Sequence, residues 1–268
     1  MHQHEYVGQG TFFKMVHVAY DKVLRVSCED KKNTIFYHIH NPDICAKLNF
    51  IKIYPEAKWI AMVRNPVDSC ESWSYDYFLE NNYSEIVMNI KTMLYEIDNV
   101  ITKGKNIVGI RLEDLKGNPK KTIKALCKWM NITEEDSLYD MTAQGKKWWG
   151  DLSCFDKKPF GKISNEKIGK VFSRKDRFIL ESLFYPFNLR FGYTKKNKNF
   201  KKDIDTIYPM MFALFDFEKK ISKRMKVDYE DFMETGYYKY LRIIMKERWN
   251  ILRQYYTYPG MIKPLKLD

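Results

Sequence analysis

Residues 58–73 hold the side chains whose types and spacing are best suited to chemistry. The apolar run 59–63 is typical of a buried strand, and Arg64 follows it directly. Asn65 is a favoured N-cap and Pro66 a favoured first residue for the helix that comes next. Arg64 is therefore predicted at the carboxyl end of a strand and beside a helix N-terminus. Anionic ligands bind at such places in open α/β sheets.

Ser72 extends this pattern by one more polar group. It lies eight residues after Arg64, two turns down the same expected helix. A guanidinium offers a charged fork and a hydroxyl offers a further hydrogen bond, so the pair suits a phosphate group. The alternative is an ordinary surface charge at a helix start and an ordinary serine on a helix face.

Two further predicted strands also end in polar residues. His38 and His40 lie at the end of the strand expected at 34–39, and the acidic pair 113–114 follows the strand expected at 106–112. The carboxyl ends of parallel strands meet at one edge of a sheet. We therefore expect these side chains and the arginine to line one crevice and share a ligand.

The two histidines have more than one interpretation. Residues two apart on a strand face the same side, so His38 and His40 could form a metal pair. No further Cys, His or carboxylate stands at helpful spacing, so no metal is expected. Two interpretations remain open: a structural histidine at a strand end, or a general base that takes a proton from a hydroxyl.

The elements that position these residues alternate between strands and helices. This order predicts an α/β fold, a three-layer parallel sheet flanked by helices. The region 145–175 mixes Gly, Pro, Lys and Trp without a period, so we expect a long functional loop. The spacing of apolar residues and the Asn-Pro pairs, which favour helix starts, predict the helices. They are expected at 11–26, 42–54, 66–79, 84–103, from 119 onward, and at 174–188.

A polar, lysine-rich linker at 194–202 divides the chain in the sequence. We expect an α/β domain at 1–194 and a basic helical C-terminal extension at 195–268. The region 237–248 is an amphipathic pattern rich in aromatic residues. It predicts either a solvated helix docked on the domain or a helix that contacts a membrane surface or a partner.

Composition limits the partners. The 268-residue chain has a formal net charge of +12, which favours a nucleotide, an acidic glycan, nucleic acid or a membrane surface. A lysine-rich compositional bias explains the charge equally well, and no nucleic-acid-binding signature accompanies it, so nucleic acid is not expected. Five scattered cysteines, and the lack of an apolar leader or span, predict a cytoplasmic protein with reduced thiols.

Taken together, residues 34–194 resemble the sulfotransferases that use 3′-phosphoadenosine 5′-phosphosulfate. The segment 63–72 is similar to that family's 3′-phosphate motif, Arg-(Asn/Asp)-Pro-x-Asp with a later serine. The segment 110–119 is similar to its Tyr-Glu-Asp-Leu and Asn-Pro element, with Leu112 in place of the usual tyrosine. The segment 38–42 is similar to the Lys-Thr-His-x-Pro stretch of its cytosolic members.

Near the end of the α/β region, 168–170 and 191–193 resemble the family's closing nucleotide-binding loop and domain end. The resemblance implies a fold of the P-loop nucleotide-hydrolase type and sulfuryl transfer to a hydroxyl or amine of a glycan or small molecule. It implies His40 as the catalytic base, with His38 in place of a lysine that steadies the sulfonate. The nucleotide ligands that it implies are Arg64 and Ser72 for the 3′-phosphate, and Lys162, Lys167, Gly169 and Lys170 in the closing loop.

One element of the family pattern has no counterpart in residues 1–33. The family's first strand and its Pro-Lys-Ser-Gly-Thr-Thr loop hold the 5′-phosphosulfate, and nothing in this segment matches them. Three explanations stay open: a truncated gene product, a loop built differently, or a protein that does not catalyse transfer. The last would be a nucleotide-binding protein, or a membrane-binding or partner-binding protein, derived from the same fold.

Overall fold

A computed structural model describes residues 6–23, 34–39, 44–96, 106–140, 142–143, 146–147, 163, 165–254 and 262–267. The chain divides into two compact units, Met1–Lys58 and Trp59–Asp268. Arg64, Ser72 and the described part of the closing loop belong to the second unit, whereas both histidines belong to the first.

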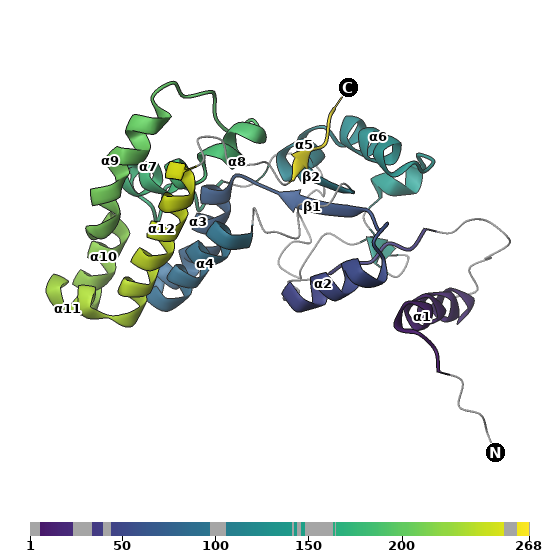
Figure 1. The fold of residues 1–268 in the computed structure, drawn as a ribbon, viewed down its shortest axis with the longest axis horizontal. Helices are drawn as coiled ribbons and strands as arrows, with labels where there is room; N and C mark the ends of the chain where they lie inside the picture. Colours follow the sequence, from purple (N-terminus) through teal and green to yellow (C-terminus); the bar gives the residue numbers. More distant parts are fainter. Residues whose placement is uncertain are drawn as a thin grey trace, which may run out of the picture. The chain divides into compact units, whose positions relative to one another are not determined.

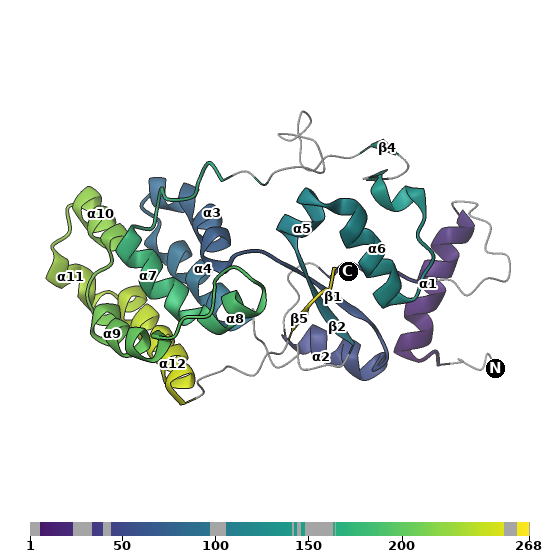
Figure 2. The same ribbon diagram turned by 90° about the horizontal axis from the view of Figure 1, so that it is seen from above.

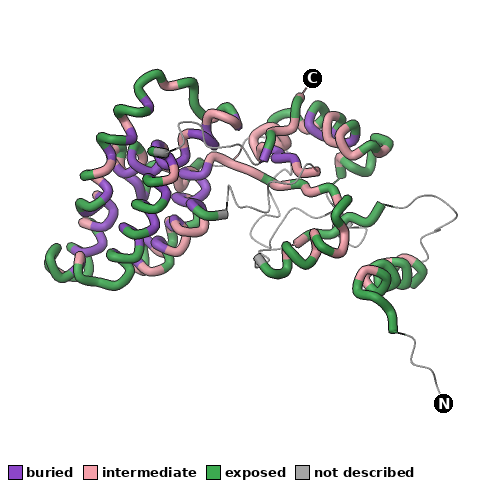
Figure 3. The backbone as a smooth tube through the Cα atoms, viewed as in Figure 1, coloured by how far each residue is buried: buried purple, intermediate pink, exposed green. Residues whose placement is uncertain are grey.

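The first unit contains two helices, α1 (Gln9–Val23) and α2 (Ile44–Ile53), in agreement with the predicted helices. Its packing centres on Phe13, whose ring lies 5.1 Å from that of Tyr37 and 5.6 Å from that of Phe50. No described side chain in this unit is fully buried, and Figure 3 shows α1 and α2 mostly exposed.

The predicted strand at 34–39 is wrong, because these residues form no regular secondary structure. The run is rich in residues that favour strands, such as Ile35, Phe36 and Tyr37, but their side chains are exposed. Strand preference reflects packing on a half-buried pleated surface beside another strand. Residues 34–39 pair with no strand among the described residues.

The sheet lies in the second unit and has three parallel strands in the order β1-β2-β5. Strand β1 (Trp59–Val63) pairs along its whole length with β2 (Ile107–Arg111), so that Val63 stands opposite Arg111. The short β5 (Lys263–Pro264) lies on the other side of β2, as Figures 1 and 2 show. The α/β class is thus confirmed, but the third strand comes from the C-terminal end of the chain rather than from 34–39.

The helix starts after Asn-Pro follow the prediction. Asn65 caps α3 (Pro66–Leu79), because its side chain accepts the backbone N–H of Asp68 at 3.1 Å. The pair Asn118-Pro119 opens α6 (Pro119–Met130), and there the hydroxyl of Thr122 donates to the carbonyl of Asn118 at 2.9 Å. The remaining helices of the unit are α4 (Tyr83–Glu96), α5 (Leu112–Gly117), α6 (Pro119–Met130), α7 (Arg174–Leu183), α8 (Tyr185–Arg190), α9 (Phe200–Phe212), α10 (Asp216–Met225), α11 (Tyr229–Glu234) and α12 (Gly236–Gln254).

Three short elements complete the described part of the second unit. A two-stranded antiparallel ladder joins β3 (Thr142–Ala143) to β4 (Lys146–Lys147), and a 3-10 helix spans Asp136–Tyr139. Of the two strands, only β4 falls inside the region 145–175 predicted as a long loop, and more than half of that region lies outside the described residues.

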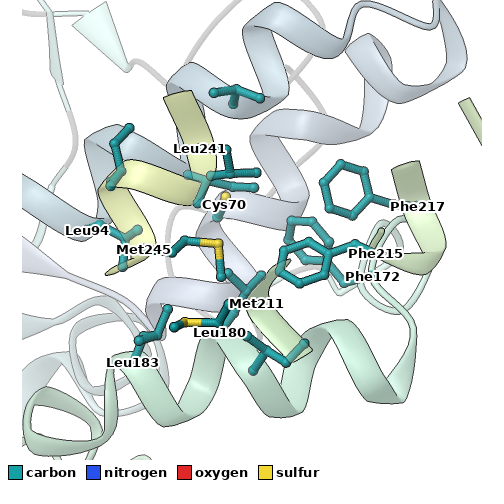
Figure 4. Close-up of a cluster of buried hydrophobic side chains, with 14 of the residues drawn as sticks. Cys70, Leu94, Phe172, Leu180, Leu183, Met211, Phe215, Phe217, Leu241 and Met245 are labelled. Carbon is teal, nitrogen blue, oxygen red and sulfur yellow. The ribbon is translucent and has the colours of Figure 1, made fainter. Parts of the chain in front are cut away.

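One large apolar core joins helices from both sides of residue 194. Helices α3, α4 and α7 supply residues such as Cys70 and Leu180, and α9 and α12 supply residues such as Met211, Leu241 and Met245. Figure 4 shows these side chains gathered in one cluster. The core therefore does not follow the predicted boundary between 1–194 and 195–268.

Buried polar contacts reinforce this junction. The carboxylate of Asp176 on α7 accepts the backbone N–H groups of Asp216 and Phe217, at 2.8 and 3.1 Å, in the first turn of α10. A carboxylate at a helix N-terminus satisfies N–H groups that have no partner within the helix. Farther along α10, the fully buried Glu218 pairs with the guanidinium of Arg242 on α12.

The amphipathic helix predicted near the C-terminus is present as α12. Its apolar residues Leu241, Ile244 and Met245 are buried in the core, where α12 packs against α4 and α9. This packing agrees with the interpretation of a helix docked on the domain. Among the described residues, the helices are all too short or too polar to span a membrane.

A second, small core covers one face of the sheet. Phe187 and Phe191 at α8 pack with Ile262 against Val63 and other sheet residues. Gly109, at the centre of β2, makes this approach possible. A Cβ atom at Gly109 would lie only 2.5 Å from the Phe191 ring.

Candidate functional site

Arg64 stands at the carboxyl end of β1, as predicted, with a half-buried side chain. Its guanidinium donates to the side-chain oxygen of Asn165 at 3.3 Å, across 101 residues of sequence. Asn165 begins the described part of the closing loop, which contains Gly169 and Lys170. The structure thus places the strand-end arginine beside this loop.

The end of β2 converges on the same place. One carboxylate oxygen of Glu113 accepts the backbone N–H of Asn65 at 3.4 Å, and the other accepts the hydroxyl of Tyr193 at 2.8 Å. The prediction that the ends of these two strands line one edge is confirmed. The third expected end, which would carry the histidines, is absent because 34–39 is not a strand.

Tyr193 lies at the edge of this site, although no individual role was predicted for it from the sequence. Gly192 adopts a positive φ of 71°, which suits glycine and lets the chain turn before Tyr193. The guanidinium of Arg111 lies 4.7 Å from the centroid of the tyrosine ring, and Arg111 also pairs with Asp114 at 3.6 Å. Burial, followed by the hydrogen bond to Glu113 and its charge, raises the pKa of Tyr193, so the phenol stays protonated as a donor.

A buried carboxylate on α3 fixes the end of the closing loop. Glu71 is fully buried, and one of its oxygens accepts the backbone N–H groups of Val171 and Phe172 at 2.8 and 2.9 Å. The other oxygen accepts Nη1 of Arg177 at 2.8 Å, and Nη2 of Arg177 donates to Asp68 at 2.5 Å. Helix α3 thereby holds both the loop end and the first turns of α7.

Sequence reasoning missed Glu71 and Arg177, although a signal was present. Glu71 shares the buried side of α3 with Val67, Cys70 and Ser74. A carboxylate in such a position requires hydrogen-bond donors or a cation. Burial acts to lower the pKa of Arg177, but the hydrogen bond to Asp68 and the surrounding carboxylates outweigh it and raise that pKa.

Ser72 lies on α3 between the two places where the loop and α7 are anchored. Asp68, Ser72 and Asp76 follow each other at intervals of four residues, so they share one face of the helix. Arg177 binds Asp68 at one end of this row, and Lys167 binds Asp76 at the other with a distance of 2.8 Å. Ser72 is half-buried in the middle of the row.

The predicted residues of the closing loop have different surroundings. The ammonium of Lys167 is directed to α3, where it meets Asp76 and lies 5.3 Å from the centroid of the Tyr75 ring. Gly169 has a positive φ of 77° and open space where a Cβ would be, and Lys170 is exposed. Lys162 lies outside the described residues.

The two histidines belong to the first unit of the chain, whereas the residues of this site belong to the second. His38 is exposed in the first unit, and His40 lies outside the described residues. With no strand at 34–39, the argument that both imidazoles face one side of a strand no longer applies. Within the described part of the chain, no three His, Cys, Asp or Glu side chains are grouped as metal ligands.

The site as described is suited to an oxyanion. It combines the Arg64 fork, the Asn165 amide, the N-terminus of α3 and a glycine loop with an exposed lysine, and each of these can donate hydrogen bonds to oxygen. No family model, curated protein or solved structure matches this chain.

Proposed function

We propose that this protein binds 3′-phosphoadenosine 5′-phosphosulfate and transfers its sulfuryl group to a hydroxyl of an acceptor. The observation that carries the proposal is the contact between Arg64 and Asn165. Asn165 lies between Lys162 and Lys167, two of the loop residues that the sequence resemblance assigns to the same nucleotide site as Arg64. Arg64 and Asn165 are far apart in the chain, so their contact was not implied by sequence proximity.

Charge supports a phosphate at this position. The bond from Arg64 to Asn165 is long and its acceptor is neutral. A phosphate oxygen would form charge-assisted bonds, which are roughly twice as strong as neutral ones. We assign Arg64 and Ser72 to the 3′-phosphate of the nucleotide.

In this proposal the closing loop binds the nucleotide through its backbone as well as its side chains. The absence of a Cβ at Gly169 allows an anion to approach the backbone N–H groups, which form a concave set of donors in such turns. Lys170 adds a positive charge, while Lys167 ties the loop to α3. The loop would then cover the nucleotide opposite Arg64.

In the proposed reaction, the acceptor oxygen attacks sulfur in line with the bridging oxygen of the donor. The new O–S bond forms as the bond from sulfur to the phosphate oxygen breaks, and adenosine 3′,5′-bisphosphate leaves. A base takes the hydroxyl proton, and His40 is the base that the resemblance implies. Positive groups stabilise the charge that develops on the leaving phosphate.

Calorimetric titration with adenosine 3′,5′-bisphosphate tests the binding step. We expect wild type to bind, Arg64→Ala to lose binding by about a hundredfold, as for a hydrogen-bonded charge pair, and Arg253→Ala on α12 to bind like wild type. The control removes an equal charge from the same unit. Absence of binding to wild type, or equal losses in both variants, would overturn the proposal.

Nucleotide binding without transfer is the second candidate. Residues 9–23 form helix α1, and the described residues before β1 contain no strand followed by a glycine-rich loop. This observation favours the second candidate. A radiolabelled sulfate-transfer assay over phenols, amines and glycans separates the two candidates. Transfer to any acceptor supports the first, and bisphosphate binding without transfer to the whole panel supports the second.

A further inference from the structure

The segment after Tyr193 presents a group of exposed lysines around an open hollow. Lys195 and Lys196 lie in the segment that leads to α9, and the hollow itself has a volume of about 700 Å³. We propose that this hollow binds an acidic glycan, a chain of sugar hydroxyls with sulfate or carboxylate groups. Its lining residues are Lys198, Asn199, Lys201, Lys202, Asp205 and Thr206.

The backbone that carries these lysines is held in a defined conformation. The N–H of Asn197 donates to the Tyr185 hydroxyl at 2.7 Å, and its side-chain amide donates to Asp203 at 2.7 Å. The Asn197 side-chain oxygen also accepts the N–H of Asn199 at 2.8 Å. The ring of Tyr185 stacks on Phe200 with centroids 4.1 Å apart. A ligand would therefore meet lysines whose backbone is already held in place. This lowers the conformational entropy that is lost on binding.

Two of these lysines lie at the start of a helix, where positive charge lowers helix stability. Lys201 and Lys202 lie in the first turn of α9, and the helix dipole disfavours positive charge there. Asp203 is the one acidic residue in that turn, and it accepts the amide of Asn197. An anionic ligand would relieve this unfavourable arrangement, because it would meet both the ammonium groups and the free N–H groups of the helix start.

A second hollow, of about 430 Å³ at the start of α6, serves as a comparison. Its lysines also stand near a helix N-terminus, but they share the lining with Glu134 and Asp136. The hydroxyl of Tyr139 donates to Glu134 within the same lining. Three lysines face two carboxylates there, whereas three lysines face the single carboxylate of Asp205 in the α9 hollow, so the latter has the stronger positive potential.

The polar groups of the α9 hollow favour a glycan over nucleic acid. Single-stranded nucleic acids bind through exposed aromatic rings on which bases stack, but Phe200 is buried and covered by Tyr185. Asn199, Thr206 and Asp205 offer amide, hydroxyl and carboxylate groups to sugar hydroxyls. The carboxylate of Asp205 can accept hydrogen bonds from a glycan hydroxyl.

The glycan proposal does not depend on nucleotide binding. Thr194 continues directly from Tyr193, which hydrogen-bonds Glu113 at the edge of the oxyanion site, and leads to the lysine segment. If the protein is a sulfotransferase, the glycan is the class of acceptor that this surface recruits. That acceptor role alone rests on the proposed function.

Titration with a heparin octasaccharide, at about 50 mM and about 150 mM salt to reveal the electrostatic contribution, tests the inference. The first variant replaces Lys198, Lys201 and Lys202 by Gln, and the matched control replaces Lys120, Lys121 and Lys124 by Gln. Both remove the same charge, each from residues near a helix start. We expect about a tenfold loss of affinity, or about 1.4 kcal/mol, for the first variant, and less than half that free-energy change for the control.

Several outcomes are decisive. Equal losses in the two variants would show an effect of net charge alone, and absence of binding at low salt would also overturn the inference. Tighter binding of a single-stranded RNA or of anionic lipid vesicles, lost in the same α9 variant, would assign the surface to that ligand instead. Retention of octasaccharide binding in Arg64→Ala is expected, so failure of the nucleotide proposal and failure of the glycan proposal remain distinguishable. Melting temperatures of both variants at or above wild type would confirm that they fold, since the lysines oppose the helix dipole.

Discussion

The guanidinium of Arg177 donates to the buried carboxylate of Glu71 at 2.8 Å and so joins α7 to α3. The same carboxylate accepts the N–H groups of Val171 and Phe172, at the end of the closing loop. The end of the loop is therefore held to α3 by the buried carboxylate of Glu71, in addition to the contact between Lys167 and Asp76. This residue lies one position before Ser72, the proposed phosphate ligand.

Substitution of Glu71 by Gln should destabilise the protein. The amide keeps the shape of the side chain but loses the negative charge and places an NH₂ group among donors, so we expect a loss of about 1–3 kcal/mol in the free energy of unfolding. Urea denaturation measures the loss. Glu181→Gln is the control, because Glu181 also pairs with Arg177, at 3.2 Å, but its side chain is 45% exposed whereas that of Glu71 is fully buried. That variant should lose less than about 1 kcal/mol, and equal losses would contradict the role of the buried carboxylate.

Substitution of Gly109 by Ala should disturb the sheet. The added methyl group would lie 2.5 Å from the Phe191 ring and 2.9 Å from Ile262, so one of these side chains must move. Overpacking of this kind costs about 1–3 kcal/mol, which chemical denaturation can measure. Gly117→Ala is the control, since open space surrounds a Cβ at Gly117. An unchanged stability of Gly109→Ala would show that the contact between α8 and the sheet is loose.

Alkaline pH should destabilise the protein partly through Tyr83. Burial, then the charge of Glu218 and the hydrogen bond to it, raises the pKa of Tyr83 above its ordinary value. A group whose pKa is higher in the folded state contributes stability that is complete below its unfolded pKa and declines as pH rises beyond it. For a tyrosine this decline begins near pH 10, at about its unperturbed pKa.

Stability curves across this pH range test the role of Tyr83. Tyr83→Phe should be less stable than wild type at neutral pH, because its hydroxyl donates to Glu218 at 2.5 Å. Its stability should fall less steeply with pH above about pH 10, because the ionising phenol is gone. Tyr229→Phe, at an exposed position, should follow the wild-type curve. Parallel curves for wild type and Tyr83→Phe would contradict the assignment.

Thiol labelling should separate the cysteines by burial. Cys45 is exposed, whereas Cys70 and Cys127 are buried. Burial, with a smaller contribution from the charge of Glu71, raises the pKa of Cys70 to about 12, so almost no thiolate forms near neutral pH. With iodoacetamide at about pH 8, where ordinary thiols begin to react, peptide mass spectrometry should find Cys45 alkylated before Cys70 and Cys127. Rapid labelling of Cys70 in the native protein would show that α3 is not packed as described, and urea should make its labelling fast.

Local sequence preferences determined the elements that lie closest to the proposed oxyanion site. The apolar run 59–63, the cap at Asn65 and the proline at Pro66 each act within a few residues, and together they define the end of β1 and the start of α3. The same local rules predicted β2 and α6. Because parallel strands share an edge, the approach of Glu113 to Asn65 also followed from sequence.

Other features depended on contacts between distant segments, and only the tertiary structure decided them. Residues 34–39 have the composition of a strand but pair with no strand in the described part of the chain, while the two residues of β5 become a strand because β2 lies beside them. The linker at 194–202 has the composition of a domain boundary, yet the helices on both sides bury their apolar faces in one core.

The partners of Glu71 and Arg64 likewise lie about a hundred residues away, at Arg177 and Asn165. The sequence predicted the arginine at the end of a strand, because the strand, the cap and the helix start each depend on neighbouring residues. It determined neither the burial of Glu71 nor the groups that both side chains meet, because these depend on how the whole unit packs.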